Sequence, residues 1–187
     1  MRINAILMAA GNSHRFGSNK LIHVIDGKPM FQHILEKVLA VESGLFQHII
    51  VVTQYQEIMR MAEKFDKALL LVENDNSNAG ISYSIQLGME ADAADAYAFF
   101  VCDQPKLKSE TIEGFIKGFQ NSGKTIGCVT CKGRLGNPVV FMSCYYQELL
   151  NLNGDAGGKS VMKSHMEEVF FFEVEDEREL YDMDEVK

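Results

Sequence analysis

The sequence of 187 residues has no tryptophan, three prolines and only four cysteines. Cysteine is too sparse for a secreted disulfide scaffold. Basic residues are also in the minority, because 18 Lys and Arg face 26 Asp and Glu, which gives a formal net charge of -8. This charge repels the phosphates of nucleic acids and of anionic lipids. We therefore expect neither nucleic acid nor a membrane as a partner.

Long apolar runs are absent as well. No run approaches the roughly 20 residues that are needed to cross a bilayer. The first residues, Met1 to Leu7, lack the long apolar segment and the small-residue cleavage site of a signal peptide. The sequence therefore predicts a cytoplasmic protein.

The four cysteines, Cys102, Cys128, Cys131 and Cys144, lie in or beside apolar stretches. Cys128 and Cys131 have the Cys-x-x-Cys spacing of some metal sites, but they fall in a predicted strand. Residues three apart in a strand point to opposite faces and cannot share a metal. We expect buried, reduced thiols, since free cysteine behaves as a small hydrophobic residue.

What the sequence does contain is ordinary globular composition, with 47% hydrophobic and 24% charged residues. The length is below that at which a hydrophobic core usually splits, so a single domain over residues 1–187 is predicted. Apolar runs predict strands at residues 3–8, 48–53, 68–72, 96–102, 126–131, 138–142 and 169–174.

Between the early strands, apolar residues recur every three or four positions, which predicts helices around residues 30–39, 58–65 and 112–119. The third helix is expected to begin after Ser109 as its N-cap. Alternating strands and helices imply a Rossmann-like, three-layer α/β/α fold with a mostly parallel sheet, whose ligands bind at the carboxyl ends of the strands. From about residue 125 the order changes, which predicts mixed pairing at one edge and a cap over the site.

The acidic carboxyl end, residues 173–185, is expected to be a solvated edge except at Asp182-Met183-Asp184.

The first predicted strand leads into a loop of small residues, 9–20, with two glycines and the two cations Arg15 and Lys20. Small side chains let backbone N–H groups approach phosphate oxygens, and the cations add a planar fork and a point charge. The loop matches neither a Walker A motif nor Gly-x-Gly-x-x-Gly. A phosphate-binding loop of another type is predicted, against the alternative of a plain βα turn.

The fourth predicted strand ends in Cys102-Asp103-Gln104-Pro105, which places one carboxylate where the ligand crevice is expected. Mg²⁺ usually takes one or two carboxylates together with substrate phosphates. Asp103 is therefore a candidate Mg²⁺ ligand, although it could instead cap the next turn.

The motifs together resemble nucleotidyltransferases of the molybdenum-cofactor (MobA-like) type, and within that group the cytidylyltransferases. The resemblance rests on residues 7–21, Asp26-Gly27-Lys28-Pro29-Met30, residues 79–88, Asp103-Gln104-Pro105, residues 136–141 and 152–158, and Asp182-Met183-Asp184. The motifs follow one another in the family's order. The resemblance implies a fold like that of nucleotide-diphospho-sugar transferases. The chain departs from the family after Asp184, where it continues only as Glu185-Val186-Lys187.

The resemblance implies that residues 1–105 bind a nucleoside triphosphate and residues 125–187 bind the acceptor. Catalytic roles fall to Arg15, Lys20 and Asp103. Nucleotide binding falls to these three and to Ala9, Ala10, Gly11, Asn12, Ser13, Gly17, Gly80 and Ser84. The metal, Mg²⁺, falls to Asp103, with Asp184 as a second candidate. Acceptor binding falls to Asn137, Asp155, Gly157 and Lys159.

The implied reaction moves CMP from CTP, or another nucleoside monophosphate, onto the phosphate of a molybdopterin-type acceptor and releases pyrophosphate. The preference for CTP rests on Ala10, where the similar guanylyl enzymes carry glycine. The alternatives are a guanylyl or sugar-phosphate nucleotidyltransferase, a non-catalytic carrier of the molybdenum cofactor that serves a molybdoenzyme, and a redox enzyme on the same scaffold.

Overall fold

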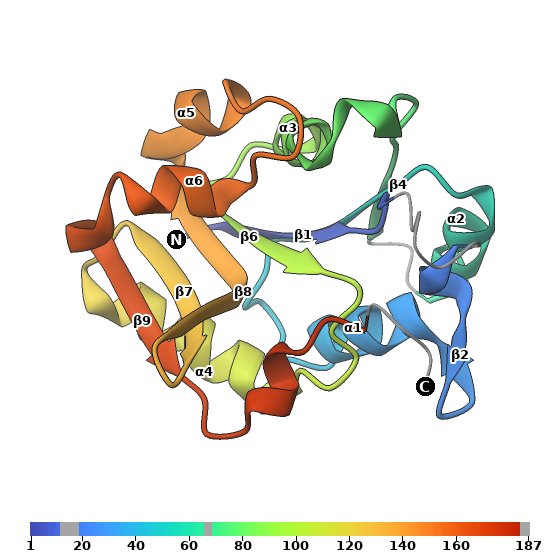
Figure 1. Cartoon of the computed structure of the whole chain (residues 1–187), viewed down its shortest axis with the longest axis horizontal. Coiled ribbons are helices and arrows are strands. Elements are labelled where there is room, and N and C mark those ends of the chain that lie inside the picture. The colour runs from blue at the N-terminus through green and yellow to red at the C-terminus, as the bar shows by residue number, and fades with distance from the viewer. Residues whose placement is uncertain (12–18, 66–68, 184–187) are drawn as a thin grey trace.

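A computed structural model describes residues 1–11, 19–65 and 69–183. Its main sheet has seven strands in the order β5-β4-β1-β6-β8-β7-β9 (Figure 1). Their bounds are β1 Ile3–Met8, β4 His48–Thr53, β5 Leu69–Glu73, β6 Ala96–Val101, β7 Ile126–Cys131, β8 Arg134–Met142 and β9 Val169–Glu173. A small separate hairpin joins β2 (Val24–Ile25) to β3 (Lys28–Pro29). All seven predicted strands are present, and the predicted mixed, mostly parallel sheet is confirmed.

The strand pairing in the main sheet changes from parallel to mixed after about residue 125, where the alternation of strands and helices in the sequence also ends. Strands β5, β4, β1 and β6 are parallel, whereas β8 runs antiparallel to both β6 and β7. Strand β8 starts four residues earlier than predicted, because Lys132 and Gly133 have positive φ angles and form a tight turn from β7. Such turns match the twist of a hairpin and extend its pairing.

Helices cover both faces of the sheet. Helices α1 (Met30–Leu39), α2 (Gln56–Ala62) and α4 (Ser109–Ser122) pack on one face, and α3 (Ile81–Ala91), α5 (Tyr146–Leu150) and α6 (Gly158–Lys163) on the other (Figure 1). Short 3-10 helices are η1 (Lys20–Ile22), η2 (Ser77–Ala79), η3 (Ser143–Tyr145), η4 (Met166–Glu168) and η5 (Glu177–Leu180). Apolar periodicity does not reveal α3, because its buried face includes Ser82, Ser84 and Gly88.

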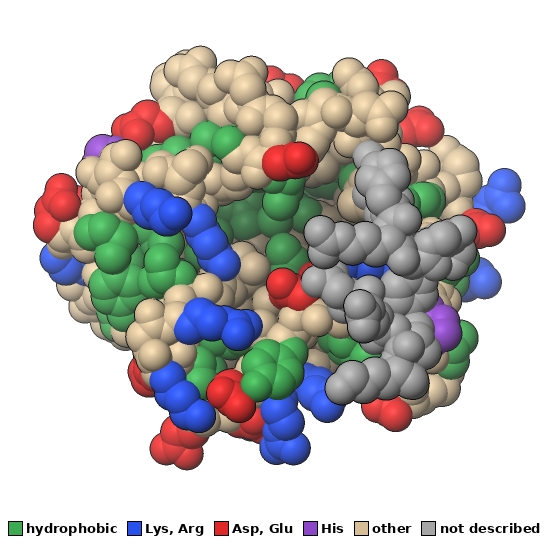
Figure 2. Space-filling view, in the orientation of Figure 1, with side chains coloured by type: hydrophobic (Ala, Val, Ile, Leu, Met, Phe, Trp, Pro, Cys, Tyr) green, Lys and Arg blue, Asp and Glu red, His purple; other side chains and the backbone are tan. Residues whose placement is uncertain are grey.

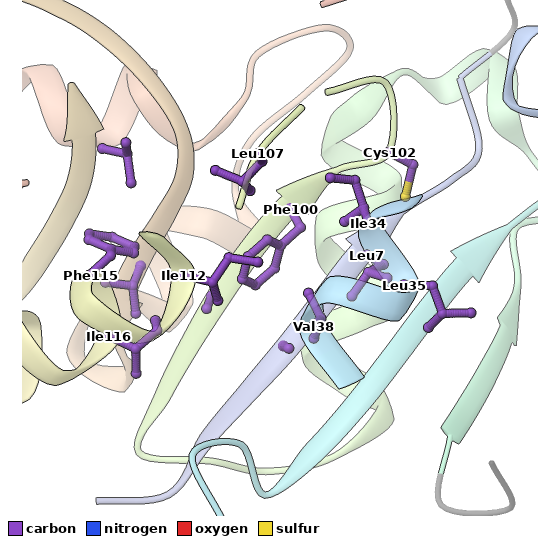
Figure 3. Close-up of a cluster of buried hydrophobic side chains, with 14 of the residues drawn as sticks. Leu7, Ile34, Leu35, Val38, Phe100, Cys102, Leu107, Ile112, Phe115 and Ile116 are labelled. Carbon is purple, nitrogen blue, oxygen red and sulfur yellow. The ribbon is translucent and has the colours of Figure 1, made fainter. Parts of the chain in front are cut away.

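Successive side chains of a strand point to opposite faces of the sheet and so enter two different core clusters. In β1, Ile3, Ala5 and Leu7 contribute to the cluster under α1 and α4, while Ile6 contributes to the cluster under α3. Figure 3 shows the first cluster, in which Leu7 and Phe100 of the sheet lie close to Ile34 and Val38 of α1. Burial on both faces explains why these strands read as continuous apolar runs.

The cysteines are free thiols, and Cys128 and Cys131 point into the two different core clusters, as their spacing predicts. Burial raises the pKa of the Cys128 thiol to about 11, which keeps it protonated and unreactive. The expectation of burial is wrong for Cys144, which is exposed.

Two expectations for the region around α4 are wrong. Ser109 is the first residue of α4 rather than its N-cap, and the cap position is taken by Lys108 without a side-chain cap bond. Instead, the carboxylate of Glu179 accepts hydrogen bonds from the Lys108 backbone N–H at 3.2 Å and from the Thr111 hydroxyl at 2.6 Å. Glu179 is only 3% exposed, so the acidic carboxyl end is not uniformly a solvated edge. The carboxylate is held there because it satisfies donors that a helix N-terminus leaves free.

Across the part of the chain that the structure describes, no helix combines the length and apolarity that a membrane span requires.

Candidate active site

A cavity of about 410 Å³ opens at the carboxyl ends of β1 and β6, where parallel α/β sheets usually bind ligands. Its lining comes from the end of β1 and the following loop, from η1, from the η2–α3 junction, from the end of β6, and from the loop before α6. The lining residues are Met8, Ala10, Gly11, Lys20, Leu21, Ser77, Asn78, Gly80, Ile81, Ser84, Val101, Cys102, Asp103 and Asp155. We call this the first cavity. Figure 2 shows this face of the molecule hollowed near its centre, with hydrophobic side chains on the floor and charged ones around it.

The first cavity contains an ion pair. Lys20 Nζ lies 2.7 Å from Asp103 Oδ2, and the two side chains are 15% and 20% exposed. Two predicted catalytic residues, 83 positions apart, are therefore in direct contact. Burial raises the pKa of Asp103 above its ordinary value, and the hydrogen bond and charge of Lys20 oppose this rise. Because both side chains are largely buried, water and salt screen their attraction less than they screen that of a surface salt bridge.

The second oxygen of Asp103 is buried and has no hydrogen-bond partner among the described atoms. A buried carboxylate oxygen without a partner is costly, and a bound cation would satisfy it. Within residues 1–11, 19–65 and 69–183, no three His, Cys, Asp or Glu side chains cluster as a metal site. Asp103 therefore fits a cation of the Mg²⁺ kind, which completes its shell with substrate phosphates and water.

The loop after β1 is held by three consecutive side chains. Thr53 donates a hydrogen bond to Ala9 O, Gln54 to Ala10 O and Tyr55 to Gly11 O, each at 2.8 Å. Ala9 itself is fully buried and its N–H donates to Val52 O, so it supports the loop without lining the cavity. Ala10 and Gly11 do line the cavity.

The opposite wall is formed where η2 meets α3. Gly80 has a φ of +85°, and an ideal Cβ there would lie 2.9 Å from Asp155 N and closer still to the carbonyl group of Gly154. Ser82 N–H also donates to Gly154 O at 3.1 Å. Glycine at position 80 thus lets the loop before α6 dock against the start of α3. Ser84 lines the cavity, and its hydroxyl accepts a hydrogen bond from Asn74.

A second cavity of about 310 Å³ adjoins the first. It is lined by Met8, Ile81, Ile85, Phe99, Val101, Asn137, Val139, Asp155, Gly157, Gly158 and Lys159. All four residues predicted to bind the acceptor are in this lining. Four lining residues, Met8, Ile81, Val101 and Asp155, are common to both cavities. Two molecules that occupy the cavities would therefore meet beside Asp155.

The carboxyl-terminal segment reaches the same site. Gln104 donates hydrogen bonds to Asp182 Oδ1 at 2.7 Å and to Leu180 O at 3.3 Å, and Met183 N–H donates to Asp103 O. Asp182 lies close enough to contribute to the raised pKa of Asp103. Burial of Glu179 anchors this segment on α4, and residues 180–183 lie beside the ion pair.

Several predicted residues lie outside the described residues: Asn12, Ser13, Arg15, Gly17 and Asp184. Sequence reasoning missed other residues that shape the site, namely Thr53, Gln54, Tyr55, Ser77, Asn78 and Gln104. A signal for the first three was present, because Thr53 ends a buried parallel strand at the ligand-binding edge and Gln54 and Tyr55 follow it directly.

Comparison with known proteins identifies a family for most of the chain. The family model described as the MobA-like NTP transferase domain matches residues 5–169. The purine catabolism protein PucB of Bacillus subtilis is 25% identical over 190 residues, which cover 96% of this chain and 90% of PucB. A probable molybdenum cofactor guanylyltransferase of Pyrococcus horikoshii is 29% identical over 132 residues, which cover 69% of this chain and 62% of that protein. This chain therefore spans less than two thirds of the length of that relative.

Solved structures share the fold. A nucleotidyl transferase from Methanothermobacter superposes with a TM-score of 0.78 at 20% identity and covers 98% of this chain and 92% of its own. CMP:2-keto-3-deoxy-manno-octonic acid synthetase complexed with CTP superposes with a TM-score of 0.74 at 16% identity, over 94% of this chain and 91% of the synthetase chain. Rv0371C of Mycobacterium tuberculosis in complex with manganese superposes with a TM-score of 0.75 at 19% identity, over 94% of this chain and 90% of the Rv0371C chain. The predicted fold resemblance to nucleotide-diphospho-sugar transferases is confirmed.

Proposed function

Because the chain belongs to the MobA-like NTP transferase family, we propose that it transfers CMP from CTP to the phosphate of a molybdopterin-type acceptor. The observation that carries this proposal is the shielded Lys20–Asp103 pair at the carboxyl edge of the sheet, in which Asp103 keeps one buried oxygen for a cation. The first cavity would take the nucleotide and the second the acceptor. This assignment is supported by their common wall, which would bring the two substrates together.

In the reaction, an oxygen of the acceptor's phosphate attacks the α-phosphorus of the nucleotide. The bond from that phosphorus to the oxygen bridging the α- and β-phosphates breaks, and pyrophosphate leaves with the electron pair. The acceptor oxygen is itself the nucleophile, so no side-chain nucleophile is required. Catalysis then depends on alignment of the reacting groups and on neutralisation of charge.

Each charged residue has a part in this neutralisation. The Lys20 ammonium would bind phosphate oxygens and stabilise the charge that grows on the leaving group. The Asp103 carboxylate would hold Mg²⁺, which when bound supplies positive charge to the triphosphate oxygens. The structurally similar Rv0371C was solved in complex with manganese, which supports the use of a divalent cation by this chain. Arg15 is proposed as a second phosphate-binding cation, and Asp184 as a further metal ligand.

The preference for CTP over GTP rests on Ala10, which lines the first cavity and is 6% exposed. Its methyl group would reduce the space for the base in the first cavity, which favours the one-ring base of CTP over the two-ring base of GTP. A change of this size is typically worth about 1–3 kcal/mol, or roughly 10–200-fold in discrimination. GTP is the second candidate, because the relative from Pyrococcus is named as a guanylyltransferase.

The acceptor's phosphate is proposed to lie near Lys159, in the second cavity. The remaining lining of that cavity is largely apolar, with Asn137 and Asp155 as the other polar side chains. Such apolar walls can pack on the faces of a flat ring system, which a sugar phosphate lacks, while Asn137 and Asp155 can pair with polar groups at the ring edge. A molybdopterin-type acceptor is therefore favoured over a sugar phosphate.

The decisive experiment incubates the protein with each nucleoside triphosphate, Mg²⁺ or Mn²⁺, and molybdopterin acceptor, and follows pyrophosphate. We expect release with CTP, less with GTP, and none without either acceptor or metal. Nucleotide binding without turnover would instead indicate a carrier of cofactor for a molybdoenzyme. Binding of NAD(P)H would favour a redox enzyme. Equal or better use of GTP would contradict the CTP preference.

A further inference from the structure

Gln54 lies at the end of β4, where three side chains continue the pairing of the sheet. Strands β1 and β4 pair in parallel with an offset of 44 residues, as in Met8 opposite Val52. The bonds from Thr53, Gln54 and Tyr55 to the carbonyls of residues 9–11 keep the same offset of 44. Side-chain donors thus replace backbone donors beyond the last backbone-paired residues. The loop after β1 leaves the sheet in a fixed register.

Gln54 differs from its two neighbours because its amide is used from both ends. Its Nε2 donates to Ala10 O at 2.8 Å, and its Oε1 accepts a hydrogen bond from the Ser77 hydroxyl at 2.8 Å. Ala10 and Ser77 both line the first cavity, one from the loop after β1 and the other from η2. A single planar amide therefore ties together two walls of the cavity that are separated by 67 residues in the sequence.

The separation of these walls sets the width of the cavity. The Ala10 carbonyl cannot move away from η2 without breaking one of the two bonds, since both are of normal length for strong hydrogen bonds. A cavity held at fixed width discriminates better between a one-ring and a two-ring base than one whose walls can part.

We propose that Gln54 is a positioning residue that fixes the width of the first cavity and thereby makes the site selective for a one-ring base. The inference rests on the proposed function. It adds a determinant of base selectivity that does not itself have to touch the base. Ala10 supplies the methyl group at the wall, and Gln54 keeps that wall in place.

The test uses three variants and one control. Gln54→Ala removes both bonds. Gln54→Glu keeps an acceptor for Ser77 but has no donor for Ala10 O. Ser77→Ala removes the hydroxyl that donates to Gln54 Oε1 but leaves the bond from Gln54 to Ala10 O in place. The control is Gln56→Ala, because Gln56 lies two residues away and its amide donates to the exposed carboxylate of Glu73, outside the first cavity.

For each protein, kcat/KM is measured with CTP and with GTP, and the dissociation constant of each nucleotide is measured by calorimetry. We expect Gln54→Ala to lower the ratio of CTP to GTP by up to roughly 25-fold, since each of the two lost hydrogen bonds is typically worth about fivefold. Gln54→Glu and Ser77→Ala should each lower the ratio by a smaller factor, and Gln56→Ala should leave it unchanged. Loss of fold alone would lower both values together and leave the ratio intact.

In a Gln54→Ala protein that unfolds at the same urea concentration as the wild type, an unchanged ratio or an equal loss for both nucleotides would overturn the positioning role while leaving the nucleotidyltransferase proposal standing. If that variant is unstable, an unchanged ratio in a stable Ser77→Ala protein would overturn it. A wild-type protein that binds nucleotide but never releases pyrophosphate would refute the transfer reaction, and the calorimetric ratio would then decide on Gln54 alone. A wild-type protein that binds neither CTP nor GTP would overturn both proposals.

Discussion

Replacement of Gly80 by alanine tests whether one close backbone contact holds the two cavities together. Gly80 has φ +85° and ψ -175°, a region that is essentially confined to glycine. A Cβ added there would also approach the backbone of Gly154 and Asp155 more closely than real Cβ atoms do. The new methyl group would meet backbone atoms rather than a flexible side chain, so the loop before α6 would have to move.

Two costs add in this variant. A non-glycine residue in this backbone region costs about 1–3 kcal/mol, and forcing an extra methyl group into a packed site typically costs about 1–3 kcal/mol. The reduced freedom of the unfolded chain returns about 0.4–1 kcal/mol. We expect the free energy of unfolding to fall by about 2–5 kcal/mol, which for a chain of this length lowers the Tm by roughly 5–15 °C.

Gly123→Ala is the matched control. Gly123 also has a positive φ, +70°, but an added Cβ would meet nothing within 4 Å. Its replacement should cost no more than about 1 kcal/mol, because only the backbone strain remains. Urea unfolding gives the free energy of unfolding of both variants. The extra loss in Gly80→Ala then measures the cost of its closer backbone contacts together with its more restricted backbone angles. If Gly80→Ala matched Gly123→Ala in stability and also kept the wild-type KM for the acceptor, the docking of the loop on Gly80 would be without consequence.

The remaining predictions concern charged groups. Asp103→Asn should leave the fold intact but lower pyrophosphate release by about 100-fold or more; near-normal turnover at limiting Mg²⁺ would exclude the metal role. Lys20→Ala should lower kcat more than it raises the nucleotide KM, because charge on the leaving group grows in the transition state; a change in KM alone would make Lys20 a uniform binder. Lys159→Ala should raise the KM for the acceptor while the calorimetric nucleotide affinity stays unchanged, with the exposed Lys163→Ala on the same helix as control; loss of nucleotide affinity instead would move Lys159 to the donor side. Hydrogen bonds from His48 and Asn4 lower the pKa of Asp92, so its stabilisation is present above the ordinary value of about 3.9 and is lost as pH falls through the lowered pKa. The stability advantage of the wild type over Asp92→Asn should accordingly shrink in acid, and an advantage equal at neutral and low pH would contradict the linkage.

Residues that stand at the ends of apolar strands could be predicted from the sequence. Asp103 follows a continuous apolar run, and parallel topology then places it at the ligand edge. Lys20 belongs to the loop after the first strand, which returns to the same edge. Topology places the two residues at the same edge, whereas their direct ion pair is a finding of the structure that the sequence does not predict.

Other parts of the site depend on contacts between loops, which periodicity does not encode. The resemblance assigns Gly80 to nucleotide binding. Its backbone angles and its close approach to Gly154 show that it also lets the loop before α6 dock against α3. Glu179 lies in an acidic run that resembles a solvated edge, yet its carboxylate is buried because the free donors at the start of α4 meet it there. Neither the docking of the loop on Gly80 nor the burial of Glu179 can be predicted from the residues next to it in the sequence.

The division of the sheet suggests how specificity for the two substrates is separated. Base selectivity is proposed to depend on the parallel half, where β1 and β4 position Ala10 and Gln54. The proposed acceptor residues Asn137 and Lys159 come from antiparallel β8 and from α6. Lys159 donates a hydrogen bond to the carbonyl of Leu135, so α6 is tied to the strand that carries Asn137. Substitutions on β8 and α6 can therefore change the acceptor without moving the wall that selects the base, whereas a change at Gly80 disturbs both, because that contact joins the two halves.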